Sequence, residues 1–135
     1  MTTRDAIFPA GSARHALYHE HGYSPAIRSD GLLFVSGQVG SREDGTPEDT
    51  HLAQVERAFA NLGAILSAAG CSFDDIIDVT TFHTDPAAQF GDLMAVKDRH
   101  FPAAPYPAWT ALGVTWLAGF DFEIKVVARL PDAAR

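Results

Sequence analysis

The sequence predicts an α+β fold in which a single mixed β-sheet carries two helices on one of its faces. Two stretches place apolar residues at helical spacing, whereas several others are rich in β-branched and aromatic residues or alternate between apolar and polar residues. The helical stretches follow strands in the chain, and this order favours one mixed sheet with both helices on the same side. The uncovered face of such a sheet meets either water or another subunit.

Three strands are predicted in the first part of the chain, at residues 5–8, 26–29 and 32–38. The last two flank Asp30-Gly31, a dipeptide typical of a two-residue hairpin turn. Residues 32–35 are apolar on both faces, which indicates a central strand that is covered from both sides. The segment 15–23 fits either a strand or a loop, and the sequence leaves both open.

One further strand and two helices are predicted in the middle of the chain, at residues 76–83, 50–69 and 85–101. The apolar stripe of the first helix consists of Leu52, Val55, Phe59, Leu62 and Leu66. Gly70 is placed to end this helix. Asp85 and Pro86 are typical of an N-cap and a first helical position, and Pro102 ends the second helix. One face of the second helix is expected to carry Phe90, Leu93, Lys97 and Phe101.

The stretch 105–130 predicts a β-hairpin with strands at residues 110–117 and 120–130 and a turn at Ala118-Gly119. The second strand alternates strictly between apolar and polar residues. Its apolar face contains Phe122, Ile124, Val126 and Ala128, and its polar face contains Asp121, Glu123, Lys125 and Arg129. Because this polar face places carboxylates among apolar neighbours, it is the first place to search for a functional site.

Composition and charge narrow the classes of function. The 135 residues are expected to form one domain, 1–135, with the 47% hydrophobic and 20% charged residues of an ordinary globular protein. A net charge of −7 without a Lys/Arg cluster makes nucleic acid and anionic membrane surfaces poor partners. The sequence contains no signal-peptide pattern and no apolar run of membrane-spanning length. The single cysteine, Cys71, is interpreted as structural, and it fits a reducing cytoplasm, where we expect the protein.

The histidines near the N-terminus are candidates for a metal site. His15, His19, Glu20 and His21 place four potential ligands within seven residues, and on a strand His19 and His21 would share a face. The other histidines are scattered and form no second cluster: His51, His83 and His100. A solvated loop is therefore favoured over a metal site, and no metal ligand is predicted.

Three stretches carry a resemblance to a known family. They are YSPAIRSDGLLFVSGQVG at residues 23–40, AFANLGAILSAAGCSFDDIIDVT at 58–80, and PAWTALGV at 107–114 followed by FEIKVVARL at 122–130. Together they resemble the Rid family, also called YjgF-type or imine-deaminase-like proteins, and within it the YjgH subgroup. The resemblance implies a chorismate-mutase-like domain assembled as a homotrimer, with the three sheets forming a central barrel and ligand clefts between neighbouring subunits.

The resemblance also implies an activity and a set of site residues. Enzymes of the family hydrolyse reactive 2-imino or enamine acids to 2-keto acids and ammonia, and this chemistry requires no cofactor. Glu123 matches the glutamate that holds a water, and Tyr23 and Ser36 match the tyrosine and serine around it. These three residues are the predicted catalytic residues. Gly37 matches the glycine after that serine, and its amide is a predicted substrate contact.

Three positions depart from the family pattern. Trp109 stands where the family has an arginine that grips the substrate carboxylate, Ala111 replaces a cysteine, and Met94 replaces an asparagine-type residue. These three are predicted substrate-binding positions. An arginine forms a bidentate, charge-assisted clamp, whereas tryptophan offers one neutral N–H donor. The exchange therefore predicts a flat, less charged or aromatic imine or enamine as substrate.

The predicted hairpin also places the two halves of the site relative to each other. If its strands pair about Ala118-Gly119, Glu123 lies opposite Val114 and Trp109 lies five residues farther along, about 17 Å away at roughly 3.4 Å per residue. The two side chains then do not share a small-molecule site within one subunit. If both line one cleft, they come from different chains.

Each candidate residue also has an ordinary structural interpretation. Glu123 on an alternating strand is compatible with a solvated residue paired with Lys125, and Trp109 with packing at an interface. Tyr23 fits an anchor for a turn, and Ser36-Gly37 the end of a strand. Two classes of function therefore stay open, and the first is favoured: a hydrolytic deaminase of imine or enamine metabolites, or a non-catalytic trimeric protein that binds a small molecule in the same cleft.

Overall fold

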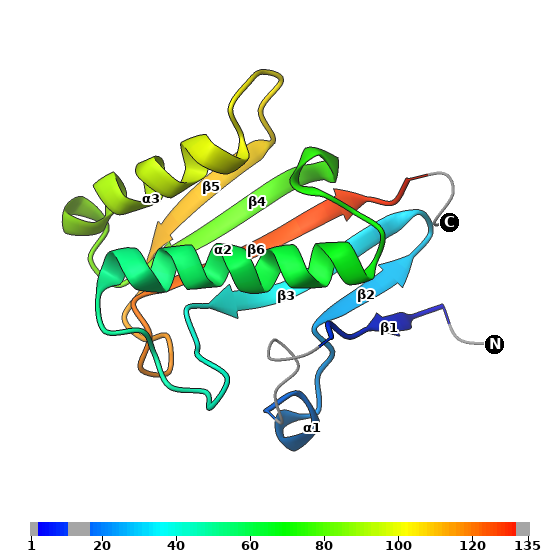
Figure 1. The fold of residues 1–135 in the computed structure, drawn as a ribbon, viewed down its shortest axis with the longest axis horizontal. Helices are drawn as coiled ribbons and strands as arrows, with labels where there is room; N and C mark the ends of the chain where they lie inside the picture. Colours follow the sequence, from blue (N-terminus) through cyan, green and yellow to red (C-terminus); the bar gives the residue numbers. More distant parts are fainter. Residues whose placement is uncertain (1–2, 11–16, 132–135) are drawn as a thin grey trace.

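The computed structural model describes residues 3–10 and 17–131 of the chain, and Figure 1 shows their arrangement. These residues form one six-stranded sheet and three α-helices. The strands are β1 (Asp5–Ile7), β2 (Ala26–Ser29), β3 (Leu32–Val39), β4 (Ile76–His83), β5 (Ala108–Gly113) and β6 (Phe122–Arg129). The helices are α1 (Leu17–His21), α2 (His51–Ala68) and α3 (Pro86–His100), and a short 3₁₀-helix covers Phe73–Asp75. The predicted α+β class with a mixed sheet is confirmed.

The sheet has the strand order β1-β2-β3-β6-β4-β5. All neighbouring strands are antiparallel except β4 and β5, which run parallel and are joined by α3 as a crossover helix. The last strand, β6, is therefore a central strand with β3 on one side and β4 on the other. The predicted pairing of the final two strands as a hairpin is wrong, because β5 and β6 lie on opposite sides of β4.

The turn predicted inside that hairpin nevertheless forms. Ala118 and Gly119 both have positive φ values, of 55° and 96°, and they reverse the chain between β5 and β6. The connection crosses the end of β4 rather than joining two adjacent strands. A turn signal in sequence reports the local backbone, and strand pairing is decided by the packing of the whole sheet.

Helices α2 and α3 both lie across the same face of the sheet, with α2 running over β3 and β6 (Figure 1). The predicted alternation of β6 is confirmed, since Phe122, Ile124, Val126 and Ala128 are buried beneath the helices. Their neighbours from the helices and from β3 complete one core: Val55, Phe59, Leu62, Ile65, Leu66, Leu93, Val96, Leu33 and Val35. Cys71 is buried at its margin, with Sγ 3.9 Å from the carbonyl oxygen of Arg129.

Helix α2 begins and ends where the sequence predicts. The Thr50 side chain accepts a hydrogen bond from the Ala53 amide at 3.1 Å, and Gly70 takes a positive φ of 78° just past the end. One residue of the predicted stripe differs. Leu52 is 39% exposed, and the first buried residue of the helix is instead Gln54. This buried amide bonds to the chain entering β6 and helps to position the candidate site.

Helix α3 lies near the edge of the sheet and buries a narrower stripe than predicted. Leu93 and Val96 are its buried residues, whereas Phe90 is 42% exposed. Asp85 makes no side-chain cap. Its amide instead donates a hydrogen bond to Oε1 of Gln89 at 2.9 Å. A side chain of the helix itself thus satisfies this backbone group at the helix start.

The segment predicted as strand or loop contains helix α1 instead. Gly22, at φ 70°, ends this short helix, and the Tyr23 amide donates to the Tyr18 carbonyl at 3.1 Å. His19 and His21 are two positions apart on a helix and so do not share a face, and the His19 ring stacks on Phe8 at 5.6 Å. His15 lies outside the described residues. Among the residues that are described, no group of three potential ligands could hold a metal ion.

None of the helices in the described part of the chain combines the length and the apolar character that crossing a membrane requires.

Two glycine substitutions should shift stability in opposite directions. A Cβ at Gly40, where β3 ends against α2, would overlap the backbone of Gln54, so Gly40→Ala is expected to destabilise by about 1–3 kcal/mol. Gly91 lies within α3 with nothing near its Cβ position, and Gly91→Ala should stabilise by about 0.5–1 kcal/mol. The free energies of unfolding of both variants in urea test the close contact between Gly40 and the backbone of Gln54. Equal effects of the two substitutions would contradict it.

Candidate functional site

Glu123 occupies a central position on the face of the sheet opposite to helices α2 and α3. On β6 it lies between Val39 of β3 and Phe82 of β4. Its carboxyl group lies over Gly37, and any Cβ at position 37 would overlap it. The pairing of β3 with β6 shifts register between Val35 and Gln38, so Gly37 falls outside the regular ladder. A glycine in this irregular segment makes room for the carboxyl group.

The environment of this carboxyl group alters its acidity. Burial raises the pKa of Glu123 above its ordinary value, and the positive charge of Lys125, two residues along the same face, partly opposes the shift. A carboxyl group with a raised pKa exchanges protons closer to neutral pH. It is therefore better suited to act as a general acid and base in turn than an exposed glutamate.

Two tyrosines stand beside Glu123. Tyr18 on α1 is buried and accepts a hydrogen bond from Nε2 of Gln38 at 3.4 Å, and its ring meets that of Tyr23 edge-on at 4.9 Å. Burial, and after it the neighbouring Tyr18 and Glu123, raise the pKa of the Tyr23 phenol. Because its pKa is raised, the Tyr23 hydroxyl stays protonated at neutral pH. The side chain is 44% exposed and therefore accessible.

Ser36 is placed differently from the other predicted catalytic residues. Its hydroxyl donates a hydrogen bond to the Ser24 carbonyl at 2.7 Å, and its amide donates to the Pro25 carbonyl at 2.9 Å. Both bonds hold the segment that follows Tyr23 against β3. In this structure Ser36 thus positions Tyr23 and does not itself face the space around Glu123.

Glu123, Tyr23 and Gly37 share a hollow of about 480 Å³, which we call the Glu123 hollow. It is lined by Tyr18, His21, Tyr23, Gly37, Gln38, Val39, Ser41, Phe82, Val114, Trp116, Leu117, Ala118, Phe120 and Glu123. The volume is that of a small-molecule site, and the lining is mostly apolar with a few polar groups.

One wall of the Glu123 hollow was not predicted from the sequence. It is the connection between β5 and β6, which contributes Val114, Trp116, Leu117 and Phe120. Trp116 is 75% exposed. The signal available in the sequence was an apolar run at a predicted turn, where polar residues are usual. The hairpin interpretation assigned Val114, Trp116 and Leu117 to its first strand and Phe120 to its second, whereas β5 ends at Gly113 and β6 begins at Phe122.

Buried Gln54 fixes the end of this connection. Its Oε1 accepts a hydrogen bond from the Asp121 amide at 2.9 Å, and its Nε2 lies 3.5 Å from the Asp121 carboxylate. The Thr84 hydroxyl donates to the same carboxylate at 3.0 Å. Helix α2 and the end of β4 thereby hold the residue two places before Glu123, which sets where β6 begins.

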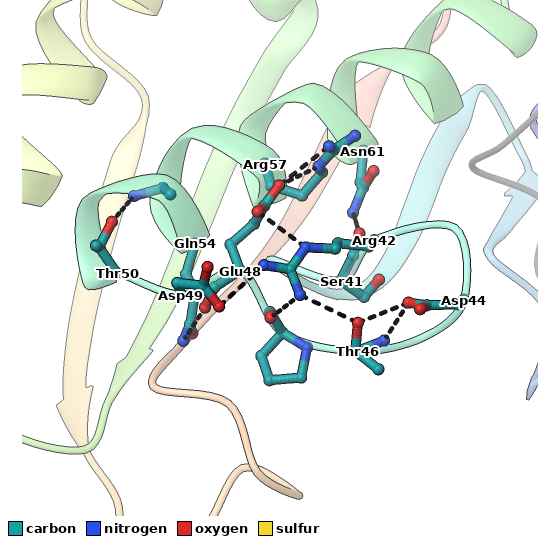
Figure 2. A network of polar contacts seen from close by, with 12 residues as sticks. Ser41, Arg42, Asp44, Thr46, Glu48, Asp49, Thr50, Gln54, Arg57 and Asn61 are labelled. Atoms are coloured by element: carbon teal, nitrogen blue, oxygen red, sulfur yellow. Dashed lines mark hydrogen bonds and ion pairs between the residues drawn. The ribbon is translucent and has the colours of Figure 1, made fainter.

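A polar network stiffens the other rim, formed by the loop between β3 and α2 (Figure 2). Glu48 bonds Arg42 at 3.1 Å and Arg57 at 3.0 Å, so one carboxylate joins the loop to the helix. Asn61 of α2 donates to the carbonyls of Val39 and Ser41 at 3.0 and 3.3 Å. These bonds fix the backbone of Ser41, which lines the Glu123 hollow.

The other predicted substrate-binding residues lie elsewhere in the protomer. Trp109 packs on the helix-covered side, edge-on against Phe101 at 5.7 Å, and its Nε1 donates to the Thr81 hydroxyl at 3.3 Å. Ala111 lies beside Thr81 in the register of β5 with β4, and Met94 is 44% exposed on α3. None of the three predicted residues, Trp109, Ala111 and Met94, lines the Glu123 hollow.

The strand register explains this separation. Glu123 pairs across β4 through Phe82 with Leu112, not with Val114 as the predicted hairpin required. Trp109 is three residues before Leu112, and an odd spacing on a strand places side chains on opposite faces. Within one protomer, Glu123 and Trp109 therefore occupy different faces of the sheet.

Thr81, which accepts the hydrogen bond from Trp109, contacts buried His83, and His51 lies near that histidine. The Thr81 hydroxyl also lies 2.8 Å from Nε2 of fully buried His83, whose pKa is lowered by burial and by the neighbouring His51. Nδ1 of His51 bonds the Asp92 carboxylate at 2.8 Å. Nε2 of His51 and Nδ1 of His83 are buried without a hydrogen-bond partner among the described residues. A proton added to His83 would thus be a poorly compensated buried charge.

His83→Gln is expected to flatten the pH dependence of stability. Because the folded-state pKa of His83 lies below its ordinary value of 6.5, the unfolded chain binds more protons as the pH falls through that value. The histidine contributes stability above the unfolded-state pKa, and this contribution is lost as the pH falls towards the folded-state pKa.

Urea unfolding of native protein and variant from about pH 7 to about pH 5.5 tests this linkage. The two slopes of unfolding free energy should differ by up to about 1.4 kcal/mol per pH unit, with the native protein steeper. Parallel slopes would show that His83 titrates alike in both states.

Comparison with known proteins identifies relatives of this chain. A family model described as endoribonuclease L-PSP matches residues 13–130. The RutC family protein YjgH of Escherichia coli K12 is 70% identical over 132 residues, which cover 98% of this chain and 99% of that protein. A mouse protein named 2-iminobutanoate/2-iminopropanoate deaminase is 33% identical over 110 residues, covering 78% of this chain and 79% of its own.

Two solved structures also resemble the structure of this chain. One titled protein YJGH matches with a TM-score of 0.92 at 69% identity, and the match covers 97% of this chain and 99% of the other. A putative endoribonuclease of Thermotoga maritima matches with a TM-score of 0.79 at 29% identity, covering 93% and 98%. The mixed sheet with its layer of helices is thus the architecture of these relatives.

Proposed function

This chain belongs to the endoribonuclease L-PSP family, also called the YjgF or Rid family, and on that premise we propose that it is a hydrolytic deaminase of reactive imine or enamine metabolites. The observation that carries the proposal is the carboxyl group of half-buried Glu123, which lies over Gly37 and lines a hollow of small-molecule size. Its raised pKa suits the proton transfers of this reaction. A relative named as an imine deaminase belongs to the same family.

In the proposed reaction, water adds to the carbon of the C=N bond. Glu123 takes a proton from this water as its oxygen bonds to carbon and passes that proton to the nitrogen, which gives a carbinolamine. Glu123 then takes the proton of the carbinolamine hydroxyl and delivers it to the amine nitrogen as C=O forms and the C–N bond breaks, so that both water protons leave with the nitrogen as ammonia. The protons balance without a cofactor.

The neighbouring residues have separate roles in this proposal. The Tyr23 hydroxyl, protonated and accessible, orients the substrate or the water. Gly37 leaves space for the carboxyl group, and its amide lies in the irregular segment of β3, where it is a candidate contact for a polar substrate atom. Ser36 acts through Tyr23, because its hydroxyl is engaged by the Ser24 carbonyl.

We further propose that the active assembly is a homotrimer in which the open faces of the sheets meet as a central barrel. Phe34 and Leu112, both on that face, are 41% and 44% exposed in the protomer, and apolar exposure of this kind is typical of an interface. A cleft between subunits would also allow Glu123 of one chain to act with Trp109 of another. Substrate preference would then be altered by tryptophan at a position where the family has arginine.

The family description names an endoribonuclease, but the Glu123 hollow does not favour a phosphate backbone. Among the residues that the structure describes, none that lines this hollow is Lys or Arg, and Glu123 contributes a carboxylate to it. The chain as a whole carries a net charge of −7. Nucleic-acid binding depends on cations that face the phosphates, so a small, uncharged or weakly charged group is the better occupant.

The alternative is a trimeric protein that binds a small molecule without turning it over. The observation in its favour is the apolar wall of the Glu123 hollow, in which Trp116 and Phe120 offer aromatic surface. The presence of Trp109 where the family has an arginine also favours binding without turnover. The two alternatives differ in whether Glu123 is needed for turnover.

Glu123→Gln should lower imine hydrolysis by about 10²–10⁴-fold, because the amide neither accepts nor returns the proton. Imines generated in place by an amino-acid oxidase, from small aliphatic to aromatic, serve as substrates, and keto-acid formation is measured. Glu43→Gln, the same change in the exposed loop after β3, is the matched control and should retain full activity. If the native protein hydrolyses no imine in the panel, the binding alternative replaces the enzyme.

Light scattering in solution should give three times the 14.5 kDa protomer mass. Phe34→Asp, on the open sheet face, should dissociate the trimer, because burying an unpaired charge in that interface is costly. Phe90→Asp, at a similarly exposed phenylalanine on α3, should leave the mass unchanged. A monomer mass for the native protein would exclude a cleft shared between subunits.

A further inference from the structure

Lys97 is held between two aromatic rings near the C-terminal end of α3. Its Nζ lies 5.1 Å from the centre of the Trp109 ring and 5.3 Å from that of Tyr106. A cation within about 6 Å of a ring face is attracted by the ring quadrupole. Two such rings restrain a side chain that is otherwise among the most flexible. The result is a positive charge of fixed position beside Trp109.

This ammonium group also lines a hollow of its own, of about 520 Å³, which we call the Lys97 hollow. The lining residues are Met94, Lys97, Asp98, Phe101, Pro102 and Tyr106. Lys97 and Asp98 supply charged groups, and Met94, Phe101, Pro102 and Tyr106 supply apolar and aromatic surface. Such a combination can hold a ligand that joins an apolar body to an ionised group.

Lys97 has no ion-pair partner in the described part of the chain. No carboxylate of these residues lies within ion-pair distance of it, whereas Arg42, Arg57 and Arg99 each have at least one. Asp98 lines the same hollow, but as the next residue on a helix it projects about 100° away around the axis. An anion that enters the Lys97 hollow would therefore meet an ammonium group with free N–H donors.

We propose that Lys97 binds the carboxylate of an aromatic imino or keto acid, while the ring of Tyr106, which lines the same hollow, contacts its planar part. This inference rests on the proposed function, including the cleft between subunits that brings Trp109 of one chain to Glu123 of another, and names the substrate class for it. Tryptophan at position 109 carries no charge, yet the structure places a cation 5.1 Å from its ring. The charge is supplied by α3, and the tryptophan ring holds the lysine in place.

A purely structural role for Lys97 makes a different prediction. The residue lies in the last turn of α3, where a positive charge interacts favourably with the helix dipole. That role involves no ligand, so it predicts no preference for an anionic compound over its neutral counterpart. Ligand preference therefore separates the two roles.

Calorimetric titration with phenylacetate and with 2-phenylacetamide makes the comparison, since the two probes share shape and differ in charge. Native protein should bind phenylacetate about tenfold more tightly, as expected for one charge-assisted contact. Lys97→Gln should lose this preference, and Lys97→Arg should keep most of it. Equal affinity of the native protein for the two probes, or binding of neither, overturns the proposal.

Two controls separate this site from the proposed reaction. Arg99→Gln removes the same charge from the same helix at a residue paired with Glu56, and it should leave the preference intact. Glu123→Gln should also leave it intact. Preference for phenylacetate without imine hydrolysis by native protein would support the Lys97 site and remove the deaminase. Hydrolysis of aromatic imino acids with a KM that Lys97→Gln does not change would remove the site and leave the deaminase.

Discussion

The candidate site depends on the insertion of strand β6 between β3 and β4. This central position buries the apolar face of β6 under the helices and turns Glu123 to the opposite face, between Val39 and Phe82. Gly37 then accepts the carboxyl group where any side chain would collide. The raised pKa of Glu123 follows from the same packing, because desolvation is its main cause.

Much of the fold follows from local sequence patterns. Burial imposes the periodicity seen in the stripe of α2 and in the alternation of β6. The Asp30-Gly31 turn reflects the positive φ values that these two residues adopt. Strand pairing is different, because it depends on residues far apart in the chain. The turn at Ala118-Gly119 has the backbone that the sequence predicts, yet the strands on either side of it are separated by β4.

The site was predictable to the extent that it lies on regular strands. Glu123, Tyr23 and Gly37 meet in one hollow, whereas Ser36 turns its hydroxyl to the Ser24 carbonyl. The wall around Trp116 belongs to a connection whose course depends on Gln54, a residue nearly seventy positions away with two hydrogen bonds to Asp121. Likewise, the sequence places tryptophan at position 109 but does not reveal that Lys97 lies against its ring.

The place of β6 in the sheet has a consequence for the synthesis of the chain. Strands β3 and β4 have no direct contact in the ladder until β6, the last strand in the described sequence, fills the gap between them. Leu32 pairs with Arg129, so the central ladder joins residues from distant parts of the polypeptide. A nascent chain on the ribosome can form α2 and the first hairpin, but it exposes an unfinished sheet until β6 emerges from the exit tunnel. This topology favours cooperative formation of the sheet, and until β6 is in place the edges of β3 and β4 present unpaired backbone groups that other chains can pair with.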